Sequence, residues 1–311
     1  MFQFFKKKSK KNLSQFFNYI LKSLNFFIIY RIGNSIGDQV CMTSIVRLIS
    51  EQYDYKIVVI SSHPEIFKHN PRITRCFAIS KDRLYWSKIL RFLSGPRLEN
   101  FLFKNTEMSF ESYMQTHGDS LHLAKAHALH FEIKISFSRI VNEIYFSPLE
   151  IETFNQKFDL PEVFSVVQPN AKLTYTPNKQ WKFDNFQYVI NKIQNINWIQ
   201  VGESKESLLD NVEDYRGKTS LRELFYLVSR AHFVFANEGL MNHVASAFNI
   251  KSYVISSGFS NIALSKYQSS VFFDSSHSCD QSPCWLKSEC GVENKPCLSN
   301  ISPETVVQSL L

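Results

Sequence analysis

Short apolar runs alternate with amphipathic stretches along most of the chain, and this pattern predicts repeated strand–helix units. In the first half, the expected strands are residues 26–30, 56–60 and 76–79. Helices are expected at 40–50 and 121–129, with a short helix that starts at His63 and ends at Asn70-Pro71. Residues 82–115 show no clear period.

The same alternation returns after a polar stretch between Pro148 and Pro161, which is expected to be a linker. The expected strands of this second series are residues 164–167, 198–201, 233–235 and 253–255. Its expected helices are residues 183–193, 220–228 and 240–248. Repeated strand–helix units predict parallel sheets covered by helices on both faces.

Two such series predict an α/β protein with two doubly wound, Rossmann-like domains that face each other across a cleft. We expect a first domain at residues 26–150 and a second at 151–311, preceded by a separate segment, residues 1–25. In folds of this class, ligands bind at the carboxyl ends of the strands. Polar residues that follow strands are therefore the first candidates for function.

The segment 1–25 is basic and amphipathic. Apolar residues from Phe16 to Phe27 recur at helical spacing, and five lysines precede them. One interpretation is a helix that packs on the following domain. The other is an interfacial helix, with its lysines on anionic headgroups and its phenylalanines at the acyl boundary. The two interpretations are compatible.

Composition narrows the class of protein. The chain has 311 residues, 44% of them hydrophobic, and a net charge of +7, which suits a globular protein that meets anionic partners. The positive charge is concentrated near the N-terminus and no nucleic-acid-binding motif accompanies it, so nucleic acid is not an expected partner. No apolar run reaches the ~18 residues of a membrane span, and a secretory signal is not expected. The expected location is the cytoplasm, with peripheral attachment to the inner membrane.

Asp38 is the first candidate for chemistry. It ends the loop Arg31-Ile-Gly-Asn-Ser-Ile-Gly-Asp38, which follows a predicted strand and opens a helix. Gly33 and Gly37 permit a tight turn. A carboxylate at the end of a strand faces the ligand side of the sheet and can act as a general base. The alternative is that Asp38 only caps the helix.

Two further loops carry candidate anion-binding residues. Lys179 follows the strand 164–167 and precedes a helix, so it can balance the charge of a diphosphate held by backbone N–H groups. Glu238 and Gly239 form the turn after the strand 233–235, and His243 lies one turn into the next helix. The alternatives are a solvated surface lysine and a buried core histidine.

Four cysteines are crowded into the C-terminal stretch 279–297, namely Cys279, Cys284, Cys290 and Cys297. Four thiolates in a loop-rich stretch can hold a tetrahedral zinc or iron ion. Disulfides are disfavoured in the cytoplasm, and the spacing lacks the usual C-x2-C. A structural zinc or iron site and four reduced cysteines both remain open.

An ordered set of motifs resembles the family 9 glycosyltransferases, the ADP-heptose:lipopolysaccharide heptosyltransferases and their relatives that modify autotransporters. The set consists of Gly37-Asp38, Lys179-x-Trp181, the stretch 217–224 and the block from Asn237 to Ala245, and it covers the chain from about Phe26 to the C-terminus. The resemblance implies a GT-B fold and an inverting transfer of heptose from ADP-heptose.

The resemblance also implies roles for individual residues. Asp38 matches the family's base and Lys179 its phosphate-binding lysine. The donor loop matches Glu238, Gly239 and His243, and Glu203 is a weaker match to an acid that contacts the nucleotide. The implied partners are a nucleotide sugar and a lipopolysaccharide core, lipooligosaccharide or other glycan or glycolipid acceptor, with no catalytic metal. Cysteine-rich tails recur in the family, and an iron site is associated with its autotransporter branch.

Leu240 departs from the family pattern, because it stands where a second glycine is expected. A leucine here would crowd a phosphate that needs a close approach to the backbone. Two alternatives to lipopolysaccharide core synthesis therefore stay open. One is transfer of heptose to a protein of the autotransporter class, and the other is a non-catalytic homologue that binds a glycan or a partner.

Overall fold

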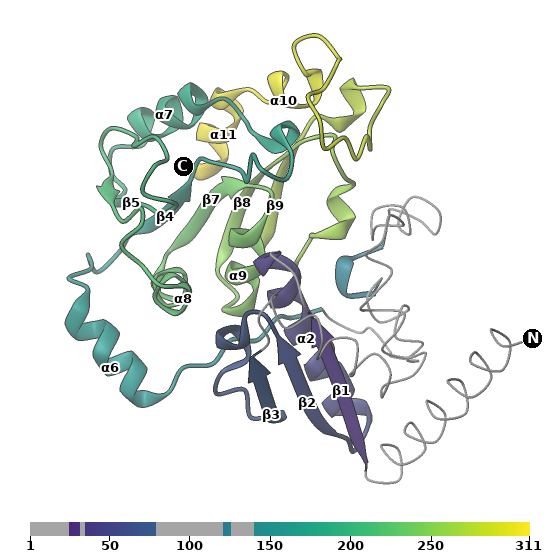
Figure 1. The fold of residues 1–311 in the computed structure, drawn as a ribbon. Coiled ribbons are helices and arrows are strands. Elements are labelled where there is room, and N and C mark those ends of the chain that lie inside the picture. The colour runs from purple at the N-terminus through teal and green to yellow at the C-terminus, as the bar shows by residue number, and fades with distance from the viewer. Residues whose placement is uncertain (1–24, 32–34, 79–120, 126–139) are drawn as a thin grey trace, which may run out of the picture. The chain divides into compact units, whose positions relative to one another are not determined.

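The chain divides into two compact α/β units in a computed structural model that describes residues 25–31, 35–78, 121–125 and 140–311 (Figure 1). The first unit comprises Met1–Gly118 and Leu123–Tyr145, and the second comprises Asp119–His122 and Phe146–Leu311. The division near residue 145 lies five residues before the boundary expected at 150. Segment 1–24, the unassigned stretch 82–115 and residues 126–129 of the helix expected at 121–129 lie outside the described residues.

The first unit contains a three-stranded parallel sheet in the order β1-β2-β3. Its elements in chain order are β1 (Phe26–Arg31), α2 (Ile36–Gln52), β2 (Lys56–Ser61), the 3-10 helix η1 (Pro64–Phe67) and β3 (Ile73–Ala78). Helix α2 begins four residues before the expected start, because the polar Gly37-Asp38 pair forms its first turn rather than the end of the loop. The predicted strand–helix–strand order is confirmed.

The second unit contains a six-stranded sheet in which every pair of neighbouring strands is parallel. Its strands are β4 (Ser165–Gln168), β5 (Trp198–Gln200), β6 (Glu213–Asp214), β7 (Phe233–Asn237), β8 (Lys251–Ser256) and β9 (Ser270–Asp274). Its α-helices are α6 (Pro148–Lys157), α7 (Phe183–Lys192), α8 (Leu221–Arg230), α9 (Leu240–Ala247), α10 (Pro296–Ser299) and α11 (Pro303–Leu310). The 3-10 helices are η2 (Pro177–Lys179), η3 (Ile262–Leu264) and η4 (Ser276–Ser278).

The strand order of this sheet is β6-β5-β4-β7-β8-β9. Counted within the second unit, this is 3-2-1-4-5-6, the doubly wound Rossmann order, in which the direction of winding reverses between β4 and β7. Ligands of such sheets bind outside the carboxyl ends of the strands at this reversal. The loops that follow β4 and β7 are therefore the positions where topology alone places a binding site.

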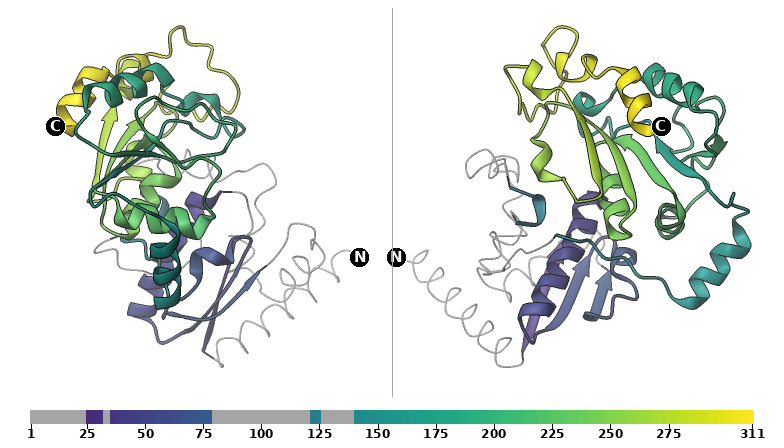
Figure 2. Two further views of the ribbon diagram at one scale, coloured as in Figure 1. Left: turned by 90° about the vertical axis from the view of Figure 1, so that its left-hand side faces the viewer. Right: turned by 180° about the vertical axis from the view of Figure 1, so that it is seen from behind.

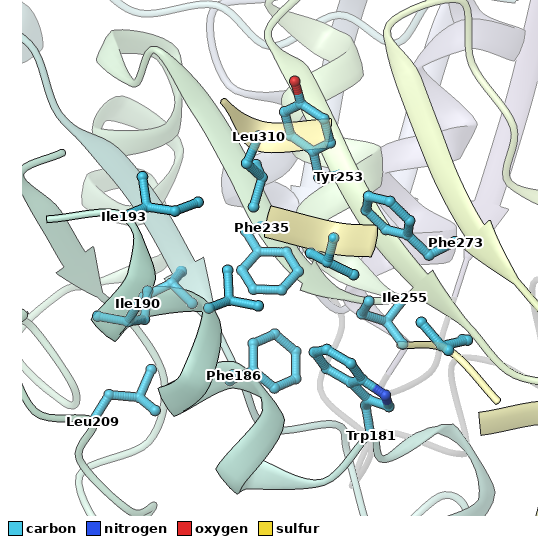
Figure 3. Packing of buried hydrophobic residues seen from close by; sticks show 14 of the residues in the cluster. Trp181, Phe186, Ile190, Ile193, Leu209, Phe235, Tyr253, Ile255, Phe273 and Leu310 are labelled. Carbon is cyan, nitrogen blue, oxygen red and sulfur yellow. The ribbon is translucent and has the colours of Figure 1, made fainter. Parts of the chain in front are cut away.

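Aromatic and aliphatic side chains fill one face of the six-stranded sheet (Figure 3). Phe233 and Phe235 on β7 point into this cluster, together with residues of α7 and α11, which lie side by side (Figure 2). The intervening Val234 points to the opposite face, because side chains alternate between the faces of a strand, and it is also buried. On that face α9 packs against β7 and β8, and α8 packs against α9. Both faces of the central strands are therefore covered, as the continuous apolar runs predicted.

The linker expected between Pro148 and Pro161 is wrong for most of its length, because it contains helix α6. Ser147 and Glu150 form a capping box, in which each side chain bonds to the other residue's backbone N–H, and Pro148 suits the first helical position. The Glu150 carboxylate also accepts from Arg222 Nη2 on α8 at 2.8 Å. The helix packs on α8 through this ion pair and through the rings of Phe154 and Tyr226, whose centres lie 5.3 Å apart.

Candidate functional site

Asp38 lies in the first turn of α2, just beyond the carboxyl end of β1. Its side chain is half-buried. The N-cap of α2 is Ser35, so the alternative that Asp38 is the cap is wrong. Residues 32–34, including Gly33, lie outside the described residues. The start of a helix carries a partial positive charge, which suits an acidic side chain in the first turn.

In the second unit, side-chain amides join the loops that follow β4 and β7. Asn237, the last residue of β7, accepts from Trp181 N at 3.1 Å and donates to Pro169 O at 2.6 Å. Gln180 accepts from Ala171 N at 2.7 Å and also donates to Pro169 O, at 2.9 Å. These bonds fix the backbone on both sides of the reversal between β4 and β7.

Lys179 and Glu238 form an ion pair at this place, between Lys179 Nζ and Glu238 Oε2. The two side chains are 17% and 12% exposed, respectively. The ammonium also lies 4.7 Å from the ring centre of Phe259 and 5.8 Å from that of Tyr175. The interpretation of Lys179 as a solvated surface lysine is therefore wrong, and two of the predicted site residues are in contact.

The ionisation of Glu238 depends on its neighbours. Burial acts to raise the pKa of Glu238, but the Lys179 ammonium, with smaller contributions from His243 and a bond to Ser265, outweighs burial and leaves the pKa below its ordinary value. The Glu238 carboxylate is therefore ionised at neutral pH. The positive charge that would meet a phosphate is already balanced by a carboxylate.

His243 and Gly239 belong to α9, which begins beside the ion pair. His243 is 5% exposed, and its Nδ1 lies 2.7 Å from the hydroxyl of Tyr267, so the interpretation as a buried histidine is confirmed. Gly239 has extended backbone and precedes the first helical residue, Leu240, which is half-buried. A Cβ on Gly239 would meet nothing closer than Asn237 O at 4.0 Å, so the described residues leave open space there.

Glu203 is placed differently from the other predicted residues. Its side chain is 69% exposed and pairs with Lys205 at 2.9 Å. The bond to Lys205 lowers the pKa of Glu203 below its ordinary value. Glu203 therefore pairs with the exposed Lys205, away from Lys179 and Glu238.

Glu206 is an acidic residue at this edge that the sequence analysis missed. Its carboxylate accepts from Asn170 Nδ2 at 3.3 Å, and burial raises the pKa of Glu206 above its ordinary value. Gly202 has φ of +148°, and a Cβ there would overlap the Glu206 carboxylate. Only glycine at position 202 lets Glu206 fold back toward β4. That glycine, two residues after the end of β5, was the available sequence signal.

The four cysteines of the C-terminal stretch are free thiols, and all four line one small cavity. Its other lining residues are Asn178, Gly258, Phe259, Gln281 and Lys295. Burial raises the pKa of Cys284 and of Cys297 above the ordinary value, and the neighbouring thiols add to the effect. Among the residues that the structure describes, no three His, Cys, Asp or Glu side chains are arranged to hold a metal ion. The four cysteines expected to bind zinc or iron therefore share one cavity, but the described side chains do not form a preformed ligand set.

The sequence matches no protein-family model and no curated protein, whereas solved structures match nearly the whole chain. A family 9 glycosyltransferase from Veillonella parvula has a TM-score of 0.65 at 12% identity, covering 90% of this chain and 94% of its own. The ADP-heptose lipopolysaccharide heptosyltransferase II of E. coli has a TM-score of 0.63 at 15% identity, covering 91% and 97%.

The chain has the GT-B fold of these glycosyltransferases. A third structure with this fold is the dodecameric iron-containing heptosyltransferase TibC in complex with ADP-D-β-D-heptose, with a TM-score of 0.64 at 12% identity, covering 91% of this chain and 75% of TibC. The GT-B architecture expected from the motifs is thus confirmed. At these identities the likeness concerns the fold, and the chemistry has to be argued from the residues.

Proposed function

We propose that the protein is an inverting glycosyltransferase that transfers heptose from ADP-heptose to the core of a lipopolysaccharide or lipooligosaccharide, or to a related glycan. The observation that carries the proposal is the Lys179–Glu238 pair at the reversal of a GT-B sheet. A fixed ammonium beside a helix N-terminus suits the diphosphate of a nucleotide sugar. The TibC and heptosyltransferase II structures, which carry ADP-heptose in their names, point to the donor.

In the proposed reaction, Asp38 removes the proton from an acceptor hydroxyl as its oxygen attacks the anomeric carbon. The bond between that carbon and the diphosphate breaks on the opposite face, and the electron pair leaves with the diphosphate. Lys179 and the first N–H groups of α9 stabilise the charge of the leaving group. His243 and Gly239 shape the start of that helix. Because fixed positive groups balance the charge, the proposal requires no catalytic metal.

The proposal assigns the nucleotide's polar contacts to the acids beyond β5. Glu203 was the expected contact, and its exposure leaves it able to turn toward a ligand. Glu206 is the better-placed acid, because it is half-buried and bonded to Asn170 next to β4. A carboxylate here would accept hydrogen bonds from ribose hydroxyls. Replacing each acid by glutamine separates the two assignments.

A thermal-shift panel of nucleotide sugars tests the donor. We expect ADP-heptose to stabilise the full-length protein, by about 2.7 kcal/mol when its concentration is 100 times the dissociation constant. UDP- and GDP-sugars at equal concentration are the controls, and we expect little effect from them. The donor assignment is overturned if ADP-heptose gives no shift while another nucleotide sugar does. A homologue that only binds glycans would respond to no nucleotide sugar, which is the outcome that Leu240 would favour.

The acceptor is tested separately. With a confirmed donor, we compare transfer to lipooligosaccharide core with transfer to an autotransporter passenger protein, using heptose incorporation as the readout. The fold favours neither acceptor, because it is shared with both TibC and the lipopolysaccharide heptosyltransferase II, and the cysteine cavity is the one feature that favours the protein acceptor. The proposal as stated favours the glycan.

The cysteine stretch is proposed to take up one structural zinc or iron ion. The thiols offer the soft donors that both metals accept, but they would have to turn inward and lose protons. We expect about one metal ion per chain in protein purified without added metal, lost when Cys284 and Cys290 are both replaced by serine. Elemental analysis is the measurement, and replacing Cys76 in the first unit by serine is the control. Metal-free protein with four freely titrating thiols would contradict the site.

The N-terminal segment is proposed to hold the protein on the inner membrane. No helix among the described residues is long and apolar enough to cross a membrane. If each lysine contributes about 1 kcal/mol near an anionic surface, neutralising five should weaken vesicle binding by roughly several thousandfold. The measurement is co-sedimentation with vesicles containing phosphatidylglycerol, and neutral phosphatidylcholine vesicles are the control. Unchanged binding would contradict the role. The lysines are Lys6, Lys7, Lys8, Lys10 and Lys11.

A further inference from the structure

Residues 279–297, here called the cysteine lobe, contact two segments that lie next to Lys179. One side is the turn at residues 176–178, which directly precedes Lys179. The other is the turn at residues 258–259, whose phenylalanine lies under the Lys179 ammonium. The proposed function uses Lys179 for the diphosphate and gives the lobe no part in that binding.

The first attachment consists of three hydrogen bonds from side chains to the lobe's backbone. Asn178 Nδ2 donates to Leu286 O and to Ser288 O, each at 2.8 Å. Thr176 Oγ1 donates to Leu286 O at 2.7 Å. Asn178 is 4% exposed, and it is adjacent in sequence to Lys179. The backbone that carries the lysine is therefore tied to the lobe at the preceding residue.

The second attachment is made by the backbone of the lobe. Cys284 N donates to Gly258 O and Trp285 N donates to Phe259 O, both at 3.0 Å. The ring centres of Phe259 and Trp285 lie 5.4 Å apart. A Cβ on Gly258 would come within 2.9 Å of Ser282 Oγ, so the lobe lies close against this turn. The Phe259 ring that supports the ammonium is thus also held by the lobe.

The side-chain amide of Asn178 lies close to both attachments. Asn178 Oδ1 is buried and accepts no hydrogen bond from any residue that the structure describes. Asn178 lines the small cavity together with the four cysteines and Gly258. Because its Nδ2 donates to two lobe carbonyls, the orientation of the side-chain amide is fixed. The side chain of Asn178 therefore bonds to the lobe and not to its own turn.

We propose that Asn178 is a positioning residue, which holds Lys179 in its phosphate-facing place by tying the 176–179 segment to the cysteine lobe. The proposal rests on the proposed function in assigning Lys179 to a diphosphate. Loss of the two Nδ2 bonds lets the segment move without removing any charge. Two ordinary hydrogen bonds correspond to roughly a tenfold change in the population of the competent arrangement.

The experiment compares ADP with AMP as probes of full-length protein by calorimetry. ADP carries the second phosphate that Lys179 would contact, and AMP lacks it. For Asn178→Ala we expect ADP to bind about tenfold more weakly while AMP binding is unchanged. Gly258→Ala, which displaces the lobe from the second turn, should act in the same direction. Ser220→Ala is the matched control, since it removes a helix cap elsewhere in the second unit.

A second readout follows Lys179 itself and does not depend on a ligand. Its rate of acylation by an amine-reactive ester, measured by mass spectrometry, should rise several-fold in Asn178→Ala and stay unchanged in Ser220→Ala. A folded Asn178→Ala protein with unchanged ADP affinity and unchanged acylation overturns the proposal. If the wild type binds no ADP but the acylation rate rises as expected, the proposed function fails and the positioning role stands. If Asn178→Ala does not fold, Gly258→Ala carries the same two readouts.

Discussion

Replacing Asp38 by asparagine is expected to lower the turnover of the transferase by on the order of 10²–10⁴, the range for loss of a general base. Asparagine has the same shape, so α2 should still begin at Ile36. Donor affinity should be retained, because the ion pair that we assign to the diphosphate belongs to the other unit. The effect should therefore appear in kcat and not in the dissociation constant of the donor.

Glu51→Gln provides the control for Asp38→Asn. Glu51 lies at the opposite end of the same helix and pairs with Arg47 at 3.0 Å. Its loss removes one negative charge from α2, and exposed i,i+4 pairs contribute about 0.3–0.5 kcal/mol. Turnover should stay near the wild-type value. ADP release in single-turnover conditions and donor binding by calorimetry are the measurements. An Asp38→Asn protein with wild-type turnover would remove Asp38 from the mechanism.

Replacing Lys179 by methionine is expected to act on both binding and stability. Loss of a charge-assisted contact should weaken donor binding by roughly ten- to a hundredfold. The carboxylate of Glu238 would then be buried without its main partner, and breaking a buried pair in this way costs about 3 kcal/mol of folding stability. The double variant Lys179→Met, Glu238→Gln should recover most of the stability and none of the donor affinity.

The pH dependence of folding stability should also differ between the wild type and Lys179→Met. In the wild type, the pKa of Glu238 is below its ordinary value of 4.5, so the ion pair's contribution is present above that pH and is lost as pH falls through the lowered pKa. In Lys179→Met, burial becomes the dominant effect and raises the pKa of Glu238. Stability should then increase as pH falls from 7 through the raised pKa. Urea denaturation between pH 4.5 and 7 measures this, and equal slopes for both proteins would contradict the assignment.

Four strands of the second unit, β4, β5, β7 and β8, were predicted because each contains a short apolar run, whereas β6 (Glu213–Asp214) and β9 (Ser270–Asp274) were not predicted. Phe233 and Phe235 face one layer of helices while Val234 faces the other, so no position needs to be polar. The contact between Lys179 and Glu238 was not predictable from spacing. It arises because β4 and β7 are neighbours in the sheet although they are not consecutive in the chain, and this follows from topology once the doubly wound order is assumed.

Other parts of the site left weaker signals. Glu206 reaches Asn170 because the chain turns at Gly202 with a positive φ, whereas the family resemblance pointed to the nearer Glu203. Asn178 carries neither a charge nor a nucleophile, so nothing in its type distinguished it from a surface amide. The linker prediction for Pro148 to Pro161 was wrong because it relied on the polar composition of the stretch, although the Ser147–Glu150 spacing is that of a capping box.

The central position of β4 and β7 in the six-stranded sheet has a consequence for amide hydrogen exchange. Each of these strands is bonded to a parallel neighbour on both sides, and Val167 and Phe235 are fully buried. Their amides should exchange only through global unfolding, whereas the loop residues 171–175, which include the exposed Leu173, can exchange through local opening. Strands β4 and β7 should therefore be among the slowest parts of the protein to exchange, and the loop 171–175 among the fastest.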